Sequence, residues 1–185
     1  MSSPVGGSCD TEVDRGLVLR RLLVPVDGSE YSRHAAEHAI RIAQAYGAEL
    51  LLLHVIDDQV LDQVAQRGED RQRVCERLHD AGRGYLHDLG RHAASAGVAH
   101  REQIEIGDPA ALICEVAARA QSDLVVIGKI GRRGARRIVM GSIARRVIEA
   151  AEIPVLVVSR PPAAVVSGHD GAAAQPRGQG EPGGR

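Results

Sequence analysis

Three short segments of the chain are apolar at nearly every position, and this feature constrains the fold more than any other. They are Glu49–Ile56 (ELLLLHVI), Asp123–Ile127 (DLVVI) and Ile153–Val158 (IPVLVV). A strand with one wet face alternates apolar and polar residues, whereas a strand of a parallel sheet is covered on both faces and reads as a continuous apolar run. These segments therefore predict a parallel sheet buried between two layers of helices.

The remaining segments supply two more strands and the helices. Arg21–Val26 is a predicted strand, and His100–Ile106 is a less buried one. Helices are predicted over Tyr31–Tyr46, over the arginine-rich, exposed stretch Asp70–Ala96, which a loop precedes, and over Ala110–Gln121. Alternation of this kind predicts an open sheet with right-handed crossovers, and a further helix follows the fourth strand. Ligands of such sheets bind beyond the carboxyl ends of the strands, where the strand order reverses.

Length and composition fit one domain with two tails. Of 185 residues, 44% are hydrophobic, enough for one core. We expect an N-terminal extension at 1–19, a folded domain at 20–160 and a disordered tail rich in Gly, Pro and Ala at 161–185. The three cysteines are widely spaced, which favours reduced thiols. With no secretory signal and no apolar run of membrane-spanning length, a cytoplasmic protein without a membrane partner is predicted.

A glycine-rich loop follows the strand DLVVI. Its markers are Gly128, Gly131 and Gly141, with Ser142 after the last. Glycine lets the main chain approach a ligand closely, and the free N–H groups at the start of the next helix favour an anion. The loop matches neither GxxxxGK[ST] nor GxGxxG, the two common phosphate motifs. A phosphate-binding loop of a different kind is therefore predicted.

Basic residues crowd the same region. Between Leu124 and Ile148 no acidic residue occurs, and the basic ones are Lys129, Arg132, Arg133, Arg136, Arg137, Arg145 and Arg146. They favour a phosphate over a neutral ligand. Nucleic acid is the alternative anion, but aromatic residues make up only 2% of the chain and the net charge is −1. Stacking on bases needs aromatic rings, so no nucleic-acid partner is expected.

The spacing Gly128-x2-Gly131-x9-Gly141-Ser142 fits the G-2x-G-9x-G-(S/T) pattern of a known family. Further matching segments are VPVDGSEYS at Val24–Ser32, LLHVID at Leu52–Asp57 and RRVIEAAEIPVLVV at Arg145–Val158. Over about residues 20–160 the chain resembles the ATP-binding branch of the universal stress protein family. The resemblance implies an α/β fold: an open five-stranded parallel sheet, Rossmann-like and adenine nucleotide alpha hydrolase-like. Its strand order would be 3-2-1-4-5, with helices on both faces.

The resemblance also implies a site for ATP with Mg²⁺. Residues at the ends of the first two strands would border the adenine and ribose: Pro25, Val26, Asp27 and Val55. Gly128 would lie by the ribose, and the phosphates would be held by Gly131, Gly141, Ser142 and Ile143. At Lys129-Ile130 the chain departs from the family, which often carries a small residue and a histidine there. No catalytic residue and no protein metal ligand is predicted.

Five polar residues have a second interpretation. Asp27 belongs to an Asp-Gly-Ser turn, and Ser142 can act as a helix N-cap. His34 and His38 share a helix face at a spacing that suits zinc, but two ligands without a third are insufficient. His54 lies within a buried strand and is expected to be a hydrogen-bonded core residue.

Two classes of function remain open from the sequence. One is a nucleotide-dependent sensor or regulator in the stress response, acting through an unknown protein partner. The other is a slow ATP hydrolase, which needs a positioned water in addition to a phosphate cradle. The lack of a recognisable base favours the sensor. An apolar last strand at a sheet edge also predicts a homodimer through Ile153–Val158.

Overall fold

The sheet is parallel throughout and has the predicted strand order. The computed structural model describes residues 18–132 and 139–159. Its five strands lie in the order β3-β2-β1-β4-β5. They are β1 (Arg21–Pro25), β2 (Glu49–Asp57), β3 (His100–Gly107), β4 (Leu124–Gly128) and β5 (Val155–Val158). The predicted fold class is confirmed. The predicted last strand is too long, because Ile153 and Pro154 precede β5.

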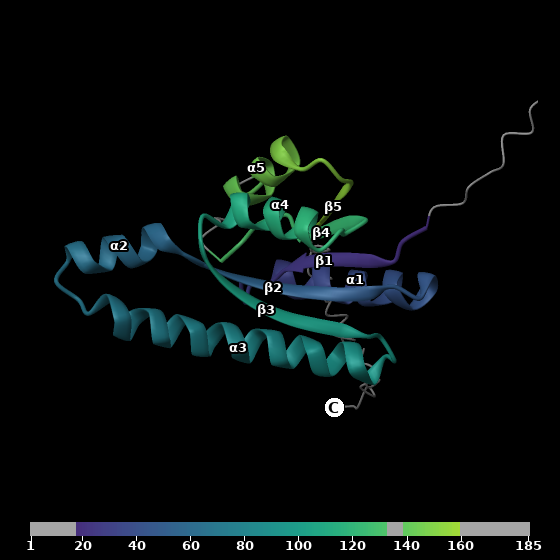
Figure 1. Cartoon of the computed structure of the whole chain (residues 1–185), viewed down its shortest axis with the longest axis horizontal. Helices are drawn as coiled ribbons and strands as arrows, with labels where there is room; N and C mark the ends of the chain where they lie inside the picture. The colour runs from purple at the N-terminus through teal and green to yellow at the C-terminus, as the bar shows by residue number, and fades with distance from the viewer. Residues whose placement is uncertain (1–17, 133–138, 160–185) are drawn as a thin grey trace, which may run out of the picture.

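Helices cover both faces of the sheet, as the apolar runs predict. Helices α1 (Glu30–Tyr46) and α3 (Arg71–Ser95) lie on one face, and α4 (Pro109–Arg119) and α5 (Ser142–Ala150) on the other (Figure 1). Alternate residues of β2 enter the two cores: Leu50 and Leu52 face α1 and α3, whereas Leu51 and Leu53 face α4 and α5. Each such side chain contributes about 1.5–3 kcal/mol on burial. This two-sided burial explains why β2 reads as an unbroken apolar run.

The prediction of a loop before residue 70 is wrong, because a short helix occupies part of that segment. Helix α2 (Asp58–Gln66) begins where the Asp57 side chain accepts a hydrogen bond from the Gln59 N–H, at 3.1 Å. Leu61 is its one buried residue, and it packs with Ile56 and Val74. With one buried residue among nine, the sequence of α2 lacks the apolar periodicity by which a helix is recognised. Helix α2 and the start of α3 extend beyond the sheet, at the left of Figure 1.

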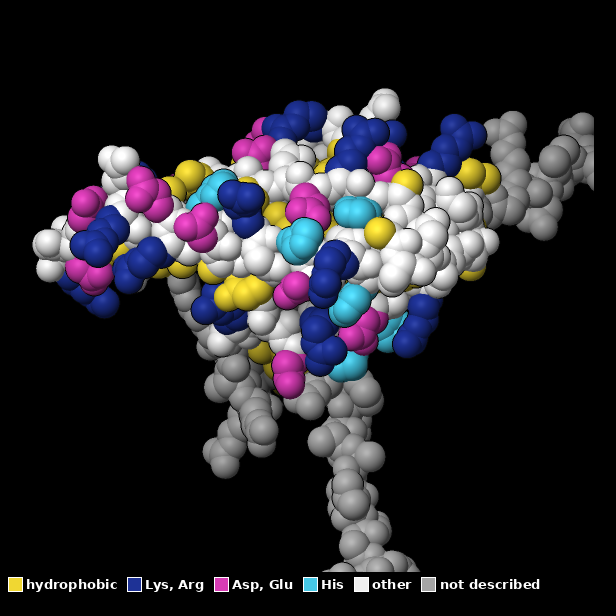
Figure 2. Space-filling view, turned by 90° about the horizontal axis from the view of Figure 1, so that it is seen from below, with side chains coloured by type: hydrophobic (Ala, Val, Ile, Leu, Met, Phe, Trp, Pro, Cys, Tyr) yellow, Lys and Arg dark blue, Asp and Glu magenta, His cyan; other side chains and the backbone are white. Residues whose placement is uncertain are grey.

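The long helix α3 is less exposed than its arginine-rich sequence predicts. A narrow stripe along it is buried against β2 and β3: Val74, Gly82, Leu86, Leu89, Gly90 and Ala93. Figure 2 shows the opposite face, on which basic, acidic and histidine side chains are intermixed. In the described part of the chain, no helix is long and apolar enough to cross a membrane.

Candidate functional site

The strand order reverses at β1, which lies between β2 and β4. Beyond the carboxyl ends of β1 and β4 the chain turns into the Asp-Gly-Ser segment and the glycine-rich loop. Gly128 ends β4 against the start of α1: an added Cβ would lie 2.7 Å from the Tyr31 carbonyl carbon and 2.9 Å from the Ser32 nitrogen. These atoms belong to the main chain and cannot turn aside. Gly128 is therefore needed for packing, whatever lies beside it.

Asp27 joins the two turns. Its Oδ1 accepts a hydrogen bond from the Ser29 N–H at 3.0 Å, and its Oδ2 accepts one from the Arg132 N–H at 2.8 Å. Burial raises the pKa of Asp27, but hydrogen bonds from Ser29 and from the Arg132 main chain more than offset it, and the pKa is lowered from its ordinary value. The carboxylate is thus ionised at neutral pH. Asp27 is both a turn residue and an anchor for the loop 105 residues later.

The glycine-rich loop is closed at its base by its own main chain. The Gly141 N–H donates to the Lys129 carbonyl at 2.9 Å. Gly131 lies against Asp27, since an added Cβ would approach Asp27 Oδ2 to 2.8 Å. Asp27 and the three motif glycines therefore meet in one region. Residues 133–138, with the predicted Arg133, Arg136 and Arg137, lie outside the described residues.

Helix α5 begins with an open turn. Its N-cap is Gly141, which has no side-chain cap hydrogen bond, so the alternative role of Ser142 as the cap is wrong. The first helical bond runs from the Arg145 N–H to the Gly141 carbonyl. The N–H groups of Ser142 and Ile143 thus precede any helical acceptor, and both residues are exposed. Such a terminus favours an anion.

Two of the predicted basic residues already have acidic partners. Arg146 makes two bonds of 2.9 Å to the Asp108 carboxylate at the start of α4, which lowers the pKa of Asp108. Arg145 lies 3.5 Å from Glu149. The positive field at the loop is therefore weaker than a count of arginines indicates.

Val55 has main-chain groups that β1 does not use. The β1–β2 pairing ends at Pro25–Leu53, with one further bond from the Val26 N–H to the Leu53 carbonyl, at 2.8 Å. In a parallel ladder the N–H and C=O of one residue face the same neighbour. The Leu50 N–H donates to Ala99, just before β3. Val55, five residues later, therefore faces the β1 side, beyond the last rung. Its N–H and C=O form an adjacent donor and acceptor there.

Pro25 and Val26 frame this position from β1. Pro25 is half-buried, and Val26 is 3% exposed. The Val26 N–H binds Leu53, and its carbonyl accepts a hydrogen bond from His54 Nδ1 at 2.7 Å. His54 is thus a hydrogen-bonded core residue, as predicted. Val26 borders the site with its main chain only.

Tyr85 and Arg132 also reach this site; Arg132 is one of the predicted basic residues of the loop, whereas the sequence reasoning missed Tyr85. The Tyr85 ring, from α3, packs directly on Gly28, whose φ of +77° and lack of a Cβ permit the contact. The Arg132 guanidinium lies 5.8 Å from the centre of the same ring. Tyr85 is one of three tyrosines and has no partner that sequence spacing reveals.

The histidine pair of α1 shows no metal arrangement. His34 Nδ1 lies 3.2 Å from the Glu37 carboxylate, on its own helix. Within residues 18–132 and 139–159, no three His, Cys, Asp or Glu side chains are placed to hold a metal ion.

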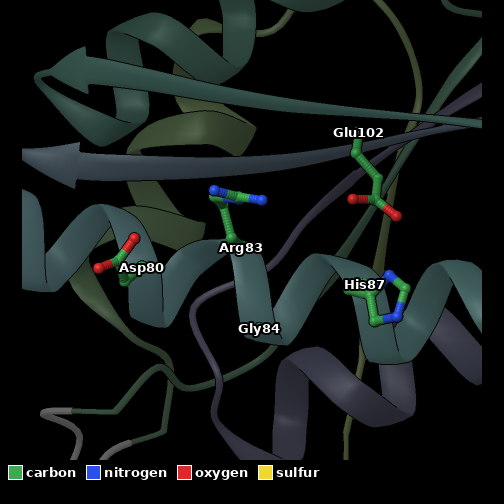
Figure 3. Close-up of a pocket in the computed structure, with 5 residues that line it drawn as sticks. All are labelled: Asp80, Arg83, Gly84, His87 and Glu102. Carbon is green, nitrogen blue, oxygen red and sulfur yellow. The ribbon is translucent and has the colours of Figure 1, made fainter.

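A separate hollow of about 320 Å³ lies between α3 and the edge strand β3 (Figure 3). Its lining residues are Asp80, Arg83, Gly84, His87 and Glu102. Figure 3 shows the side chains standing apart around the bare Gly84 instead of converging on one point. The two carboxylates offset the basic groups, so the hollow offers no field for a phosphate. It is not the candidate site.

Comparison with known proteins bears on both fold and site. A model of the universal stress protein family matches residues 19–159. Universal stress protein MJ0531 of Methanocaldococcus jannaschii is 38% identical over 143 residues, 77% of this chain and 83% of that protein. The solved structure of MJ0577, from the same organism, has a TM-score of 0.71 at 25% identity and covers 79% of this chain and 99% of that one.

Two further structures share the fold and contain nucleotides. One is a universal stress protein in complex with cAMP, with a TM-score of 0.58 and 23% identity, covering 77% of this chain and 98% of that one. The other is the universal stress protein from Archaeoglobus fulgidus in complex with dAMP, with a TM-score of 0.55 and 19% identity, covering 76% and 98%.

Proposed function

The chain belongs to the universal stress protein family, and from that premise we propose that it binds an adenine nucleotide, ATP with Mg²⁺, beyond the ends of β1 and β4. The observation that carries the proposal is the main-chain donor and acceptor of Val55, which β1 leaves without a rung. Adenine presents an amino donor at N6 and an acceptor at N1. The Val55 carbonyl and N–H match this pair, whereas guanine and hypoxanthine present the reverse pattern.

We assign the ribose and the phosphates to the turn at Asp27 and to the glycine-rich loop. Asp27 and Gly128 border the ribose, and the phosphates lie on Gly131, Gly141 and the first turn of α5 at Ser142 and Ile143. Both Asp27 oxygens already accept main-chain N–H bonds. Mg²⁺ is accordingly assigned to phosphate oxygens and water, the ligands it prefers beside a nucleotide. The cAMP and dAMP complexes of proteins with this fold support an adenine ligand.

ATP is expected to bind with a micromolar dissociation constant, about −8 kcal/mol, and ITP much more weakly. ITP keeps the ribose and triphosphate but reverses the pattern at positions 1 and 6 of the base. Two mismatched groups cost about 2 kcal/mol, roughly 30-fold in affinity. Isothermal titration calorimetry with both nucleotides measures the ratio. Equal affinities contradict the assignment of the base to Val55.

The nucleotide is proposed to control contacts with a protein partner, so that the chain acts as a cytoplasmic sensor or regulator in the stress response. ATP and AMP differ in phosphate number and so stabilise the loop to different extents. A ligand that binds one conformation of the loop more tightly than another shifts the loop toward that conformation. The loop from Lys129 to Met140 includes residues 133–138, outside the described part. Slow ATP hydrolysis is the alternative function, and sustained turnover of ATP by the purified protein would favour it.

A homodimer through the last strand is also proposed. Strand β5 lies at the edge of the sheet beside β4, and Leu156 on it is 38% exposed. An apolar edge strand tends to pair with another chain, and pairing across a twofold axis closes the assembly. Sedimentation equilibrium at micromolar concentration is expected to give a dimer. In a Leu156→Lys variant, which places a charge on the edge strand, the monomer fraction is expected to rise. A monomeric wild-type protein, with and without ATP, contradicts the proposal.

A further inference from the structure

The Val26 carbonyl is turned out of the β1–β2 ladder. Its N–H makes the expected rung to Leu53, but its oxygen accepts from the His54 side chain instead of from the next main-chain donor. The next donor of a parallel ladder is the Val55 N–H. The imidazole on β2 thus occupies the acceptor that the Val55 N–H would use, and this N–H makes no rung with β1.

We propose that His54 is a positioning residue for the base: by holding the Val26 carbonyl, it ends the ladder one rung early and leaves the Val55 N–H open to a ligand, beside the Val55 C=O. The proposal rests on the proposed function, since the base is assigned to Val55 there. His54 does not touch the nucleotide in this scheme. It acts through the conformation of Val26 and the availability of Val55.

Helix α3 fixes the imidazole in this position. His54 is 7% exposed. An added Cβ at Gly82 would overlap the imidazole ring. The ring meets Tyr85 edge to face, with centroids 6.0 Å apart and planes at 67°. Gly82 provides the space for the imidazole, and Tyr85, which also packs on Gly28, limits its rotation. Helix α3 therefore holds the imidazole that binds the Val26 carbonyl.

Loss of the imidazole donor leaves a buried carbonyl that must find another hydrogen bond. The ladder supplies one if the Val26 carbonyl turns back toward the Val55 N–H. The β1–β2 pairing then grows by one rung, and adenine N1 loses its donor. The predicted defect is thus a gain of sheet hydrogen bonding combined with a loss of base recognition.

The test compares His54→Leu with His54→Asn, whose amide nitrogen restores a donor near the position of Nδ1. In the nucleotide-free protein, amide exchange at Val55 is expected to slow by about tenfold in His54→Leu, because the N–H enters the ladder. The preference for ATP over ITP is expected to fall toward one. In His54→Asn both quantities are expected to return toward the wild-type values. A merely destabilising substitution would speed exchange.

A second pair of variants tests the position of the imidazole and leaves His54 itself unchanged. Gly82→Ala on α3 pushes the ring out of its place, whereas an alanine at Gly84, on the same helix, meets no atom within 4 Å. Gly82→Ala is expected to reproduce the slower Val55 exchange and the lost preference for ATP. Gly84→Ala is expected to leave both unchanged.

Two outcomes separate this inference from the proposed function. Unchanged or faster Val55 exchange in both His54→Leu and Gly82→Ala overturns the positioning role, even if ATP binds. Slower exchange in a protein that binds neither ATP nor ITP supports the role of His54 in the ladder and overturns the proposed function.

Discussion

Replacing Gly141 with aspartate is expected to weaken ATP binding at least about hundredfold, which is about 2.7 kcal/mol, while the fold stays intact. The backbone at Gly141 is ordinary, with φ −68° and ψ 151°. An added Cβ would lie 3.4 Å or more from its neighbours, Lys129, Ile130 and Gly131. Aspartate is also a preferred N-cap and suits the positive end of α5. The variant protein is therefore expected to be as stable as the wild type, or more so.

The loss of binding comes from charge and space together. The proposed phosphates lie on the first turn of α5, next to the new carboxylate. Two like charges about 4 Å apart near a protein surface repel by about 4 kcal/mol, more than the hundredfold loss requires. Gly141→Asn is the matched control, because it fills the same space and caps the helix without the charge. It is expected to show a smaller loss.

Calorimetry with ATP and with adenosine, together with thermal unfolding, measures these effects. Adenosine carries no phosphate, so its affinity is expected to be nearly the same in wild type, Gly141→Asp and Gly141→Asn. If Gly141→Asp binds ATP as the wild type does, the phosphates are not at α5.

Replacing Gly128 with alanine is expected to have the opposite consequence, a loss of stability before any loss of binding. The new methyl group would lie 2.7–2.9 Å from main-chain atoms of Tyr31 and Ser32. Relief requires α1 to move away from β4, although α1 contributes the fully buried Ala35 and Ala39 to the core. Overpacking of this kind costs about 3 kcal/mol, a fall in melting temperature of about 6–12 °C for a chain of this size.

Urea unfolding gives the free energy directly, and Gly84→Ala is the control. Gly84 lies within α3 with nothing near its Cβ position, so alanine there is expected to raise stability by about 1 kcal/mol. A Gly128→Ala protein as stable as the wild type would contradict the close contact between β4 and α1.

The features that the sequence predicts correctly are those that leave a repeating or local pattern. Apolar runs such as Glu49–Ile56 identify buried parallel strands, and the glycine spacing from Gly128 to Gly141 locates the loop. The strand order came from the family resemblance, because no single run says which strand is its neighbour. Helix α2 was missed because one buried residue, Leu61, leaves no period.

The contacts around the site could not be predicted, because they join residues that are distant in sequence. The bond from the Arg132 N–H to Asp27 spans 105 residues, and its donor is a main-chain group that any residue has. Tyr85 reaches Gly28 from a helix that reads as a solvated surface. Arg146 is one of the basic residues expected to contribute to the positive field of the loop, but its guanidinium binds Asp108, at the start of another helix. The type of a residue does not indicate which distant residue it will contact.

The central place of β1 also has a consequence for synthesis of the chain. β1 is complete at residue 25, but its partner β4 begins at residue 124. At about 5–20 residues per second, the nascent chain waits roughly 5–20 s with one edge of β1 unpaired. The part of the core under α1 and α3 that packs on β1 and β2 can assemble during this interval, but Val126 and Val158 complete it later. The core under α4 and α5 cannot assemble until those helices are made. The first half of the protein therefore leaves the ribosome with an open apolar sheet edge, the kind of surface that ribosome-associated chaperones shield.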